Sequence, residues 1–223
     1  MKAELTELVF ILDRSGSMSG LEDETIRGFN KMIQEQKDLS GKKKERNVNV
    51  TTILFDDQVD IIHDRFPLEI IKPLTKEEYF VRGCTALLDA IGTAVQKTDN
   101  VQQHLPEEHK AEKVIFVITT DGLENSSEHY NRSQIREMIE AKKRHGWEFL
   151  FLGANIDAVS EGVKLGISRN RSVTYENDAK GVELNFQTVG RALSKAVEKQ
   201  SASVMFEDDW AEEIRSYKER KKA

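Results

Sequence analysis

Three short runs of apolar residues with no polar interruption constrain the fold most strongly. They span residues 8–12, 114–118 and 149–152. An unbroken apolar run of this length is typical of a parallel strand that helices cover on both faces, because a half-exposed strand alternates apolar and polar residues. We therefore predict that these runs form the centre of a parallel sheet.

The segments between these runs have the periodicity of amphipathic helices. Apolar residues recur every three or four positions over residues 21–33, 87–95 and 135–139, which places them on one face of a helix. The third segment also has helix boundaries, with Asn131 as a candidate N-cap and Gly146 as a stop signal. Strands and helices are therefore expected to alternate along the chain.

The remaining segments extend this alternation. Residues 48–55 and 59–63 flank the sequence "DDQ", so they are predicted to form a hairpin that adds an antiparallel edge strand. A short helix is expected within residues 154–167, a last strand at 172–176 and a closing helix at 182–200. The predicted fold class is α/β, a Rossmann-like, doubly wound, mostly parallel sheet of about six strands with one antiparallel edge strand and helices on both faces.

Domain organisation follows from composition. The chain has only three prolines and neither an internal repeat nor a low-complexity linker, so we expect one domain over residues 1–204. Residues 205–223 form a charged C-terminal tail with acidic residues first and basic residues last, which suits a dangling or docking helix. Trp210 in this tail is a candidate for contact with another chain.

Charge and cysteine content exclude several classes of protein. The net charge of −6 disfavours nucleic acid as a partner. The single cysteine, Cys84, cannot form an internal disulfide, which indicates a reducing, cytoplasmic location. The first apolar run is too short for a signal peptide or a membrane span, so no membrane insertion is expected.

Polar residues follow the predicted strands where a ligand would bind. Asp13, Ser15 and Ser17 follow the first strand, Asp121 follows the second central strand, and Thr85 precedes the helix at 87–95. Ligands of open parallel sheets bind beyond the carboxyl ends of the strands. These side chains offer only oxygen atoms, which hard cations such as Mg²⁺ prefer. The pattern therefore predicts a divalent cation site with a position left for water or an external carboxylate.

These residues carry a family resemblance. "DRSGSM" with Thr85 and the "TDG" of Asp121 resembles the metal-ion-dependent adhesion site (MIDAS) of the von Willebrand factor type A domain family. The resemblance implies Mg²⁺ or Mn²⁺ bound by Ser15, Ser17 and Thr85 directly and by Asp13 and Asp121 directly or through water. It also implies an intracellular protein–protein interaction module, in which an Asp or Glu of the partner protein completes the coordination. The family often has Gly-Gly-Thr in the second loop, and in this sequence Cys84 replaces the second glycine. The resemblance therefore does not indicate how flexible that loop is.

Other interpretations of the same residues remain open at this point. Ser15 and Ser17 could cap the following helix, and Asp13 and Asp121 could face helix N-termini without a metal. Asp89, one helical turn after Thr85, could orient the threonine hydroxyl or simply face solvent.

The alternative function is a metal-dependent hydrolase of the phosphoesterase type, since a cation with an open position can polarise a phosphoryl oxygen. This alternative lacks a general base, because His129 is the only histidine near a predicted metal loop in the sequence.

Overall fold

The computed structural model describes residues 5–40, 47–198 and 209–222, and these build one six-stranded sheet. The strand order is β3-β2-β1-β4-β5-β6, in which β3 is antiparallel and the other strands are parallel. The strands are β1 (Leu5–Asp13), β2 (Asn47–Phe55), β3 (Val59–Pro67), β4 (Lys113–Thr120), β5 (Glu148–Ala154) and β6 (Ser172–Tyr175). The predicted α/β architecture with one antiparallel edge strand is confirmed.

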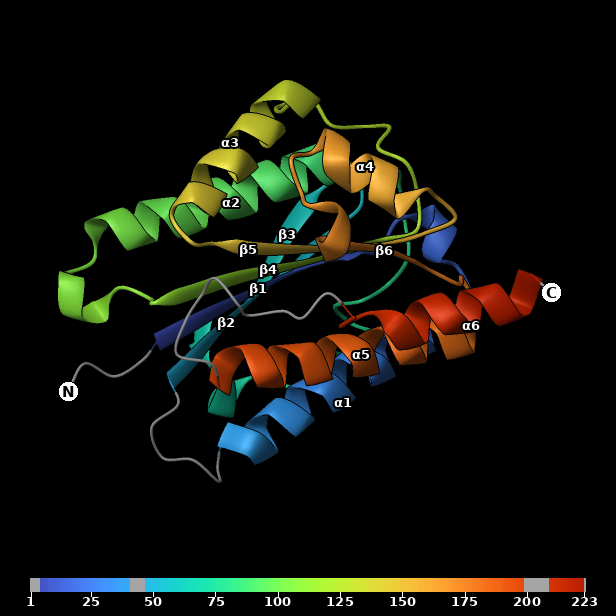
Figure 1. Ribbon diagram of the computed structural model, residues 1–223, viewed down its shortest axis with the longest axis horizontal. Coiled ribbons are helices and arrows are strands. Elements are labelled where there is room, and N and C mark those ends of the chain that lie inside the picture. The colour runs from blue at the N-terminus through green and yellow to red at the C-terminus, as the bar shows by residue number, and fades with distance from the viewer. Residues whose placement is uncertain (1–4, 41–46, 199–208, 223) are drawn as a thin grey trace.

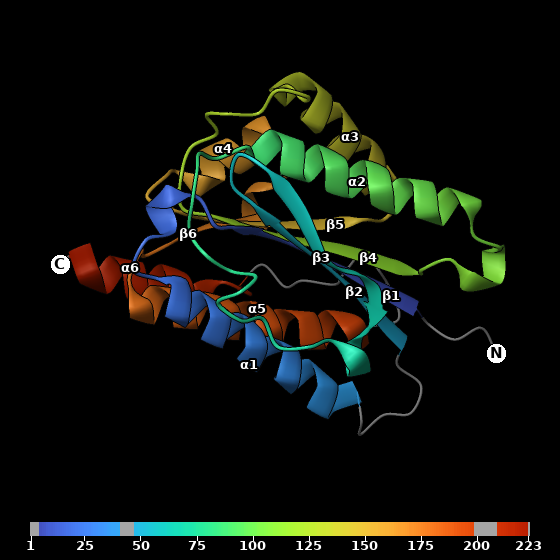
Figure 2. The same cartoon turned by 180° about the vertical axis from the view of Figure 1, so that it is seen from behind.

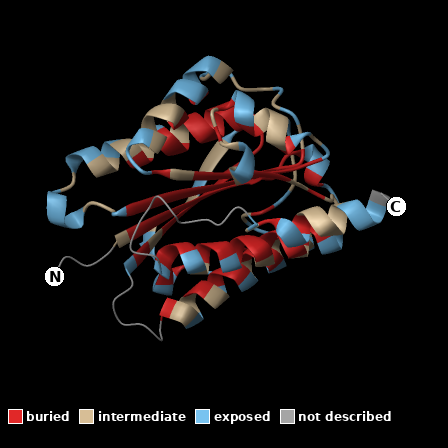
Figure 3. Ribbon diagram, in the orientation of Figure 1, coloured by how far each residue is buried: buried red, intermediate tan, exposed pale blue. Residues whose placement is uncertain are grey.

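Helices cover both faces of the sheet (Figures 1 and 2). One face carries α1 (Glu22–Ser40), α5 (Ala179–Glu198) and α6 (Glu212–Lys222), and the other carries α2 (Leu87–His104), α3 (Arg132–Arg144) and α4 (Ala158–Lys164). Figure 3 shows burial concentrated along the strands and on the inner faces of the helices. The sheet therefore separates two hydrophobic cores.

The unbroken apolar runs are explained by these two cores. Phe10 of β1 packs edge-on against Phe29 of α1, with ring centroids 5.5 Å apart. On the opposite face, Phe116 of β4 stacks on Phe149 of β5 at 4.8 Å. Successive side chains of a strand point to opposite faces, so a central strand covered on both sides needs apolar residues at every position.

The antiparallel edge strand is longer than the sequence indicated. The prediction ended at residue 63, whereas β3 continues to Pro67. The pairing with β2 is irregular here, and Arg65 has a positive φ of 52°. Its guanidinium binds the carboxylate of Glu7 in β1 at 2.6 Å, and its N–H donates to Thr51 Oγ1 at 3.2 Å. These long-range contacts hold the strand beyond the irregularity, and local sequence does not reveal them.

The end of the chain is a docked helix. α6 packs against α5 and β6, with Ile214 only 2 % exposed, and Arg191 of α5 pairs with Glu213 at 2.6 Å. Trp210 Nε1 donates to Asn170 O at 2.7 Å, so this side chain contacts its own chain, and its contact with another chain stays a prediction. The predicted boundary at 204/205 lies outside the described residues.

Within the described residues, no helix combines the length and the apolar character needed to cross a membrane.

Candidate metal centre

Asp13 lies at the carboxyl end of β1, directly beneath the connection that follows β4. It is 2 % exposed. Its Oδ1 accepts from the N–H of Ser15 at 2.7 Å, and its Oδ2 accepts from Thr120 Oγ1 at 2.6 Å and from Asp121 N–H at 3.4 Å. Because β1 and β4 are parallel neighbours, their carboxyl ends lie at the same edge of the sheet. The hydrogen bonds of Asp13 therefore connect the loop that follows β1 to the loop that follows β4.

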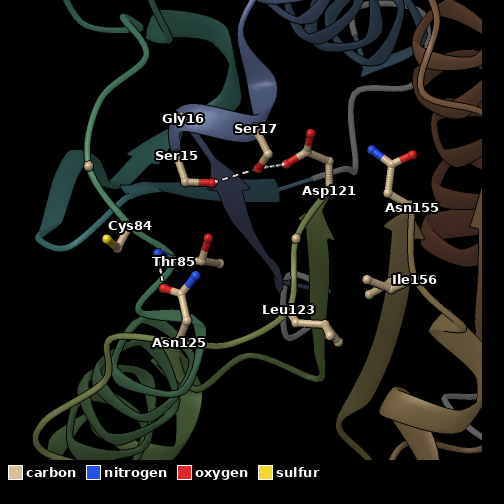
Figure 4. A pocket seen from close by; sticks show the side chains of 12 residues that line it. Ser15, Gly16, Ser17, Cys84, Thr85, Asp121, Leu123, Asn125, Asn155 and Ile156 are labelled. Atoms are coloured by element: carbon tan, nitrogen blue, oxygen red, sulfur yellow. Dashed lines mark hydrogen bonds between the residues drawn. The ribbon is translucent and has the colours of Figure 1, made fainter.

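The two serines belong to a short 3₁₀ turn at this edge, Gly16–Met18, which Ser15 directly precedes and which contains Ser17. The hydroxyl oxygens of Ser15 and Ser17 lie 3.1 Å apart, and Ser17 Oγ donates to Asp121 Oδ1 (Figure 4). Ser15 stands at the N-cap position of the turn but its side chain makes no capping hydrogen bond. The helix that the serines were expected to cap, α1, begins only at Glu22, and the hydroxyls of Ser15 and Ser17 bond to each other and to Asp121 instead, so neither serine caps it.

Thr85 reaches the same place from the loop before α2. It is 3 % exposed, and its N–H donates to Asn125 Oδ1 at 2.8 Å. Gly122 shows how closely the hydroxyls approach, because a Cβ at this position would lie 3.3 Å from both Ser17 Oγ and Thr85 Oγ1. The glycine leaves open the space that these two oxygens flank.

These residues surround a pocket of about 430 Å³ (Figure 4). Four of the five predicted residues, namely Ser15, Ser17, Thr85 and Asp121, line it, while Asp13 lies behind them. Leu123, which is 55 % exposed, and Ile156 form an apolar wall beside the oxygen atoms. The described lining residues include no histidine, lysine or glutamate.

The two carboxylates of the site share a desolvated environment. Burial, together with the negative charge of Asp13, raises the pKa of Asp121 to about 6, although hydrogen bonds from Ser17 and Asn177 oppose the shift. Burial also raises the pKa of Asp13 above its ordinary value, against the hydrogen bonds from Ser15 and Thr120. Among the described residues, neither carboxylate has a lysine or arginine in ion-pair contact.

The donor set determines which ion could bind. No group of three or more His, Cys, Asp and Glu side chains in the described part of the chain could hold a metal ion, so a metal here depends on hydroxyl oxygens. Two carboxylates and three hydroxyls suit a hard divalent cation, which prefers oxygen ligands and retains water. The open space beside Gly122 is consistent with such an ion.

Asp89 has a role that neither sequence interpretation gave. It is buried, and its carboxylate accepts from the backbone N–H groups of Glu128, His129 and Tyr130 at 2.8, 3.0 and 2.9 Å. It therefore fixes the loop after Asp121 rather than orienting Thr85 or facing solvent. The sequence places Asp89 in the first turn of α2 but does not indicate its partners, because these lie 39–41 residues further along the chain.

The loop that contains Cys84 keeps the glycine on which its geometry depends. Gly83 has a positive φ of 65°, and a Cβ there would collide with the side chain of Asp57. Cys84 is an exposed free thiol at the pocket and does not have a positive φ. A side chain at position 84 is thus compatible with the conformation of the loop.

Comparison with known proteins identifies the family of the chain. The family model of the von Willebrand factor type A domain matches residues 7–189. A search of curated proteins found no match.

Several solved structures share the fold. A von Willebrand factor type A structure from Catenulispora acidiphila has a TM-score of 0.58 and 14 % identity, covering 86 % of this chain and 43 % of that one. The pilus adhesin SpaC from Lactobacillus rhamnosus GG has a TM-score of 0.63 and 13 % identity, covering 87 % and 31 %. Proximal thread matrix protein 1 from the mussel byssus, with a zinc-occupied MIDAS motif, has a TM-score of 0.52 and 15 % identity, covering 86 % and 46 %. The chain thus spans less than half of each of these structures. On the family match and the six-stranded fold, the chain belongs to the von Willebrand factor type A domain family.

Proposed function

We propose that this domain binds a divalent cation, Mg²⁺ or Mn²⁺, through the oxygen atoms of Asp13, Ser15, Ser17, Thr85 and Asp121. The observation that carries the proposal is the convergence of three loops on one pocket, where hydroxyl and carboxylate oxygens meet and the described lining residues include no lysine, arginine or histidine. When bound, the ion would neutralise the two buried carboxylates and attract a further oxygen ligand.

We further propose that an Asp or Glu of a partner protein supplies that ligand. The pocket is open beside Gly122 and Leu123, so a side chain from outside can reach the oxygen cluster. The family is one of protein-interaction domains, which makes metal-dependent adhesion the function that this site supports best. A cytoplasmic setting is part of the proposal, and it is supported by the single free thiol of Cys84.

The hydrolase alternative lacks structural support. His129, the histidine nearest to the site in the sequence, is exposed and is not among the pocket-lining residues. Its backbone N–H donates to the carboxylate of Asp89 at 3.0 Å. A general base must lie within hydrogen-bond reach of the attacking water, and none of the described lining residues other than Asp121 could serve at neutral pH.

Thermal unfolding with added metal tests the cation. Saturating Mg²⁺ should raise the melting temperature by several degrees, because a ligand at about 100 times its Kd stabilises the native state by about 2.7 kcal/mol. Asp121→Ala should abolish the rise, whereas Glu128→Ala removes an exposed carboxylate from the same loop and should keep it. An equal response in the wild type and Asp121→Ala would contradict the proposal. Parallel titrations with Mn²⁺ and Zn²⁺ determine which ion binds most tightly.

Selection from a displayed library of random peptides tests the partner ligand. Peptides captured in Mg²⁺ and released by chelator should be enriched in Asp or Glu, and Asp121→Ala should capture none of them. Enriched peptides without an acidic residue would contradict the coordination by a partner carboxylate.

A further inference from the structure

A cluster of ion pairs around the buried side chains of Arg14 and Asp56 lies behind the candidate metal centre. Arg14 is 2 % exposed although it stands between Asp13 and Ser15. Its Nε donates to Asp56 Oδ2 at 2.8 Å, its Nη1 donates to Glu78 O at 3.1 Å, and its Nη2 pairs with Asp60. All three branches of the guanidinium therefore have partners on other segments of the chain.

The carboxylate of Asp56 also binds a second arginine, Arg82. Arg82 Nε donates to Asp56 Oδ2 at 2.7 Å, and the guanidinium carbons of Arg14 and Arg82 each lie 5.2 Å from the ring centroid of Phe80. The ring of Phe80 thus makes cation–π contacts with both guanidinium groups. We call Arg14, Asp56, Asp60 and Arg82 the arginine cluster.

The arginine cluster connects the loop of the serines to the loop of Thr85. Arg82 N–H donates to Arg14 O at 3.0 Å, Gly16 N–H donates to Gly83 O at 3.2 Å, and Tyr79 Oη donates to Asp13 O at 2.6 Å. The connection continues beyond the cluster, because Ala86 N–H donates to Asp56 O at 2.7 Å. Ala86 directly follows Thr85, so the position of Asp56 fixes that of the threonine.

The direction of the Arg14 side chain explains how it acts on its neighbours. Successive side chains of an extended segment point to opposite sides, and the backbone of Ser15 is extended, with φ −67° and ψ 170°. Arg14 therefore points to the side opposite Asp13 and Ser15, and its guanidinium is held by Asp56, Asp60 and Glu78 O away from the pocket. A shift of the guanidinium would move both flanking residues.

The arginine cluster is formally neutral, since it contains two arginines and two aspartates. Burial raises the pKa of Asp56, but hydrogen bonds from Arg82, from the N–H of Gln58 and from Arg14 lower it more, so its pKa lies below the ordinary value. Asp56 therefore stays ionised at neutral pH, and the positive charge of Arg14 is compensated close to where a cation would bind.

We propose that Arg14 is a positioning residue for the metal centre: through Asp56 it holds the loop of Thr85 against the loop of Ser15 and Ser17, and so fixes the spacing of the hydroxyl ligands. This inference rests on the function proposed above. It assigns to the residue between Asp13 and Ser15 a role distinct from direct metal binding.

Arg14→Lys separates geometry from charge. Lysine keeps the positive charge but cannot reach three acceptors in a planar fork, so any loss of metal affinity reports positioning. Binding of Mn²⁺ is measured from the electron paramagnetic resonance signal of the free ion. We expect affinity at least about tenfold weaker than in the wild type, the size of effect seen when residues that support metal ligands are changed.

Glu7→Gln is the matched control. Glu7 is 1 % exposed in β1, the strand that Arg14 directly follows, and pairs with Arg65 at 2.6 Å, but it lies near the opposite end of that strand. This variant should lose comparable thermal stability and keep the wild-type affinity for Mn²⁺. Wild-type Mn²⁺ affinity in Arg14→Lys, with only the stability loss of the control, would overturn the proposal.

A second pair of variants covers the case in which Arg14→Lys does not fold. Arg82 and Asp60 are 38 % and 45 % exposed, so Arg82→Gln and Asp60→Asn perturb the arginine cluster mildly. Both should weaken Mn²⁺ binding, by less than Arg14→Lys. Unchanged affinity in both would overturn the proposal as well.

Amide hydrogen exchange without metal distinguishes failure of this inference from failure of the proposed function. In Arg14→Lys, the amides of Gly16, Arg82 and Ala86 should lose protection together, while those of β5 keep it. If the wild type binds no Mn²⁺, the proposed function is wrong, and with it the role of Arg14 at a metal centre. If the wild type binds Mn²⁺ but protection and affinity are unchanged in the variant, only the positioning role is wrong.

Discussion

Ser17 Oγ donates a hydrogen bond to Asp121 Oδ1 across 104 positions of sequence. The bond joins the loop after β1 to the loop after β4, and it places a hydroxyl and a carboxylate oxygen side by side at the edge of the sheet. Two potential oxygen ligands are thus already together in the folded chain, which reduces the conformational entropy that a metal ion would have to overcome on binding.

Ser17→Ala should therefore reduce the affinity for the metal ion strongly while it reduces the stability of the fold only slightly. Ser17 is exposed, so we expect its loss to cost about 1 kcal/mol or less in the free energy of unfolding. Affinity for Mn²⁺ should fall by about tenfold or more. Isothermal titration of Mn²⁺ and urea unfolding measure the two effects, with Ser19→Ala, an exposed serine of the same segment, as the control. Equal affinities of the two variants would argue against Ser17 as a ligand.

Gly122→Ala should prevent metal binding by filling the space of the ion, without removing any of the proposed ligands. The added Cβ would lie 3.3 Å from both Ser17 Oγ and Thr85 Oγ1, in the space where an ion would contact them. We expect Mn²⁺ binding to be lost while the far-ultraviolet circular dichroism spectrum is unchanged. Leu123→Ala truncates the adjacent exposed side chain and should bind Mn²⁺ as the wild type does. Normal metal binding by Gly122→Ala would place any ion elsewhere.

The convergence of the site residues could be predicted from sequence because it follows from sheet topology. Three unbroken apolar runs indicate neighbouring parallel strands, and the carboxyl ends of such strands meet at one edge. The loops that carry Ser15, Thr85 and Asp121 do line one pocket. Whether these side chains bind metal is still a prediction.

The supporting contacts could not be predicted in this way. Arg14 meets Asp56 and Asp60 across 42 and 46 positions, and nothing in "DRSGSM" distinguishes a buried arginine from an exposed one. Asp89 holds backbone N–H groups of a distant loop, which depends on how α2 packs beside that loop. Such pairings are set by tertiary structure, whereas periodicity reports only the local element and its buried face.

Acid should remove the stabilising contribution of Asp56. Because the pKa of Asp56 in the folded protein lies below 3.8, its ordinary value, its ion pairs stabilise the fold above that pH. This stabilisation is lost as pH falls through the lower folded pKa. Asp56→Asn should cost up to about 3–5 kcal/mol near pH 7, because it removes the buried carboxylate that Arg14 and Arg82 share and leaves Arg14 with Asp60 as its remaining acidic partner. The difference from the wild type should shrink below about pH 4.

Urea unfolding of both proteins, in steps from about pH 7 to about pH 3, measures this difference. Taking the difference between the two proteins cancels the contributions of the other titrating groups. A difference that stays constant over this range would show that Asp56 is not held ionised by the two arginines.

Removing the buried side chain of α6 tests whether the helix belongs to the folded domain. Ile214 is 2 % exposed against α5 and β6, so Ile214→Ala should lower the free energy of unfolding by about 2 kcal/mol. Glu219→Ala changes an exposed residue of the same helix and should have an effect within about 0.5 kcal/mol. If the two variants unfold alike in urea, α6 does not contribute to the stability of the domain. If only Ile214→Ala is destabilised, residues beyond the family match at 7–189 are part of the same cooperative unit.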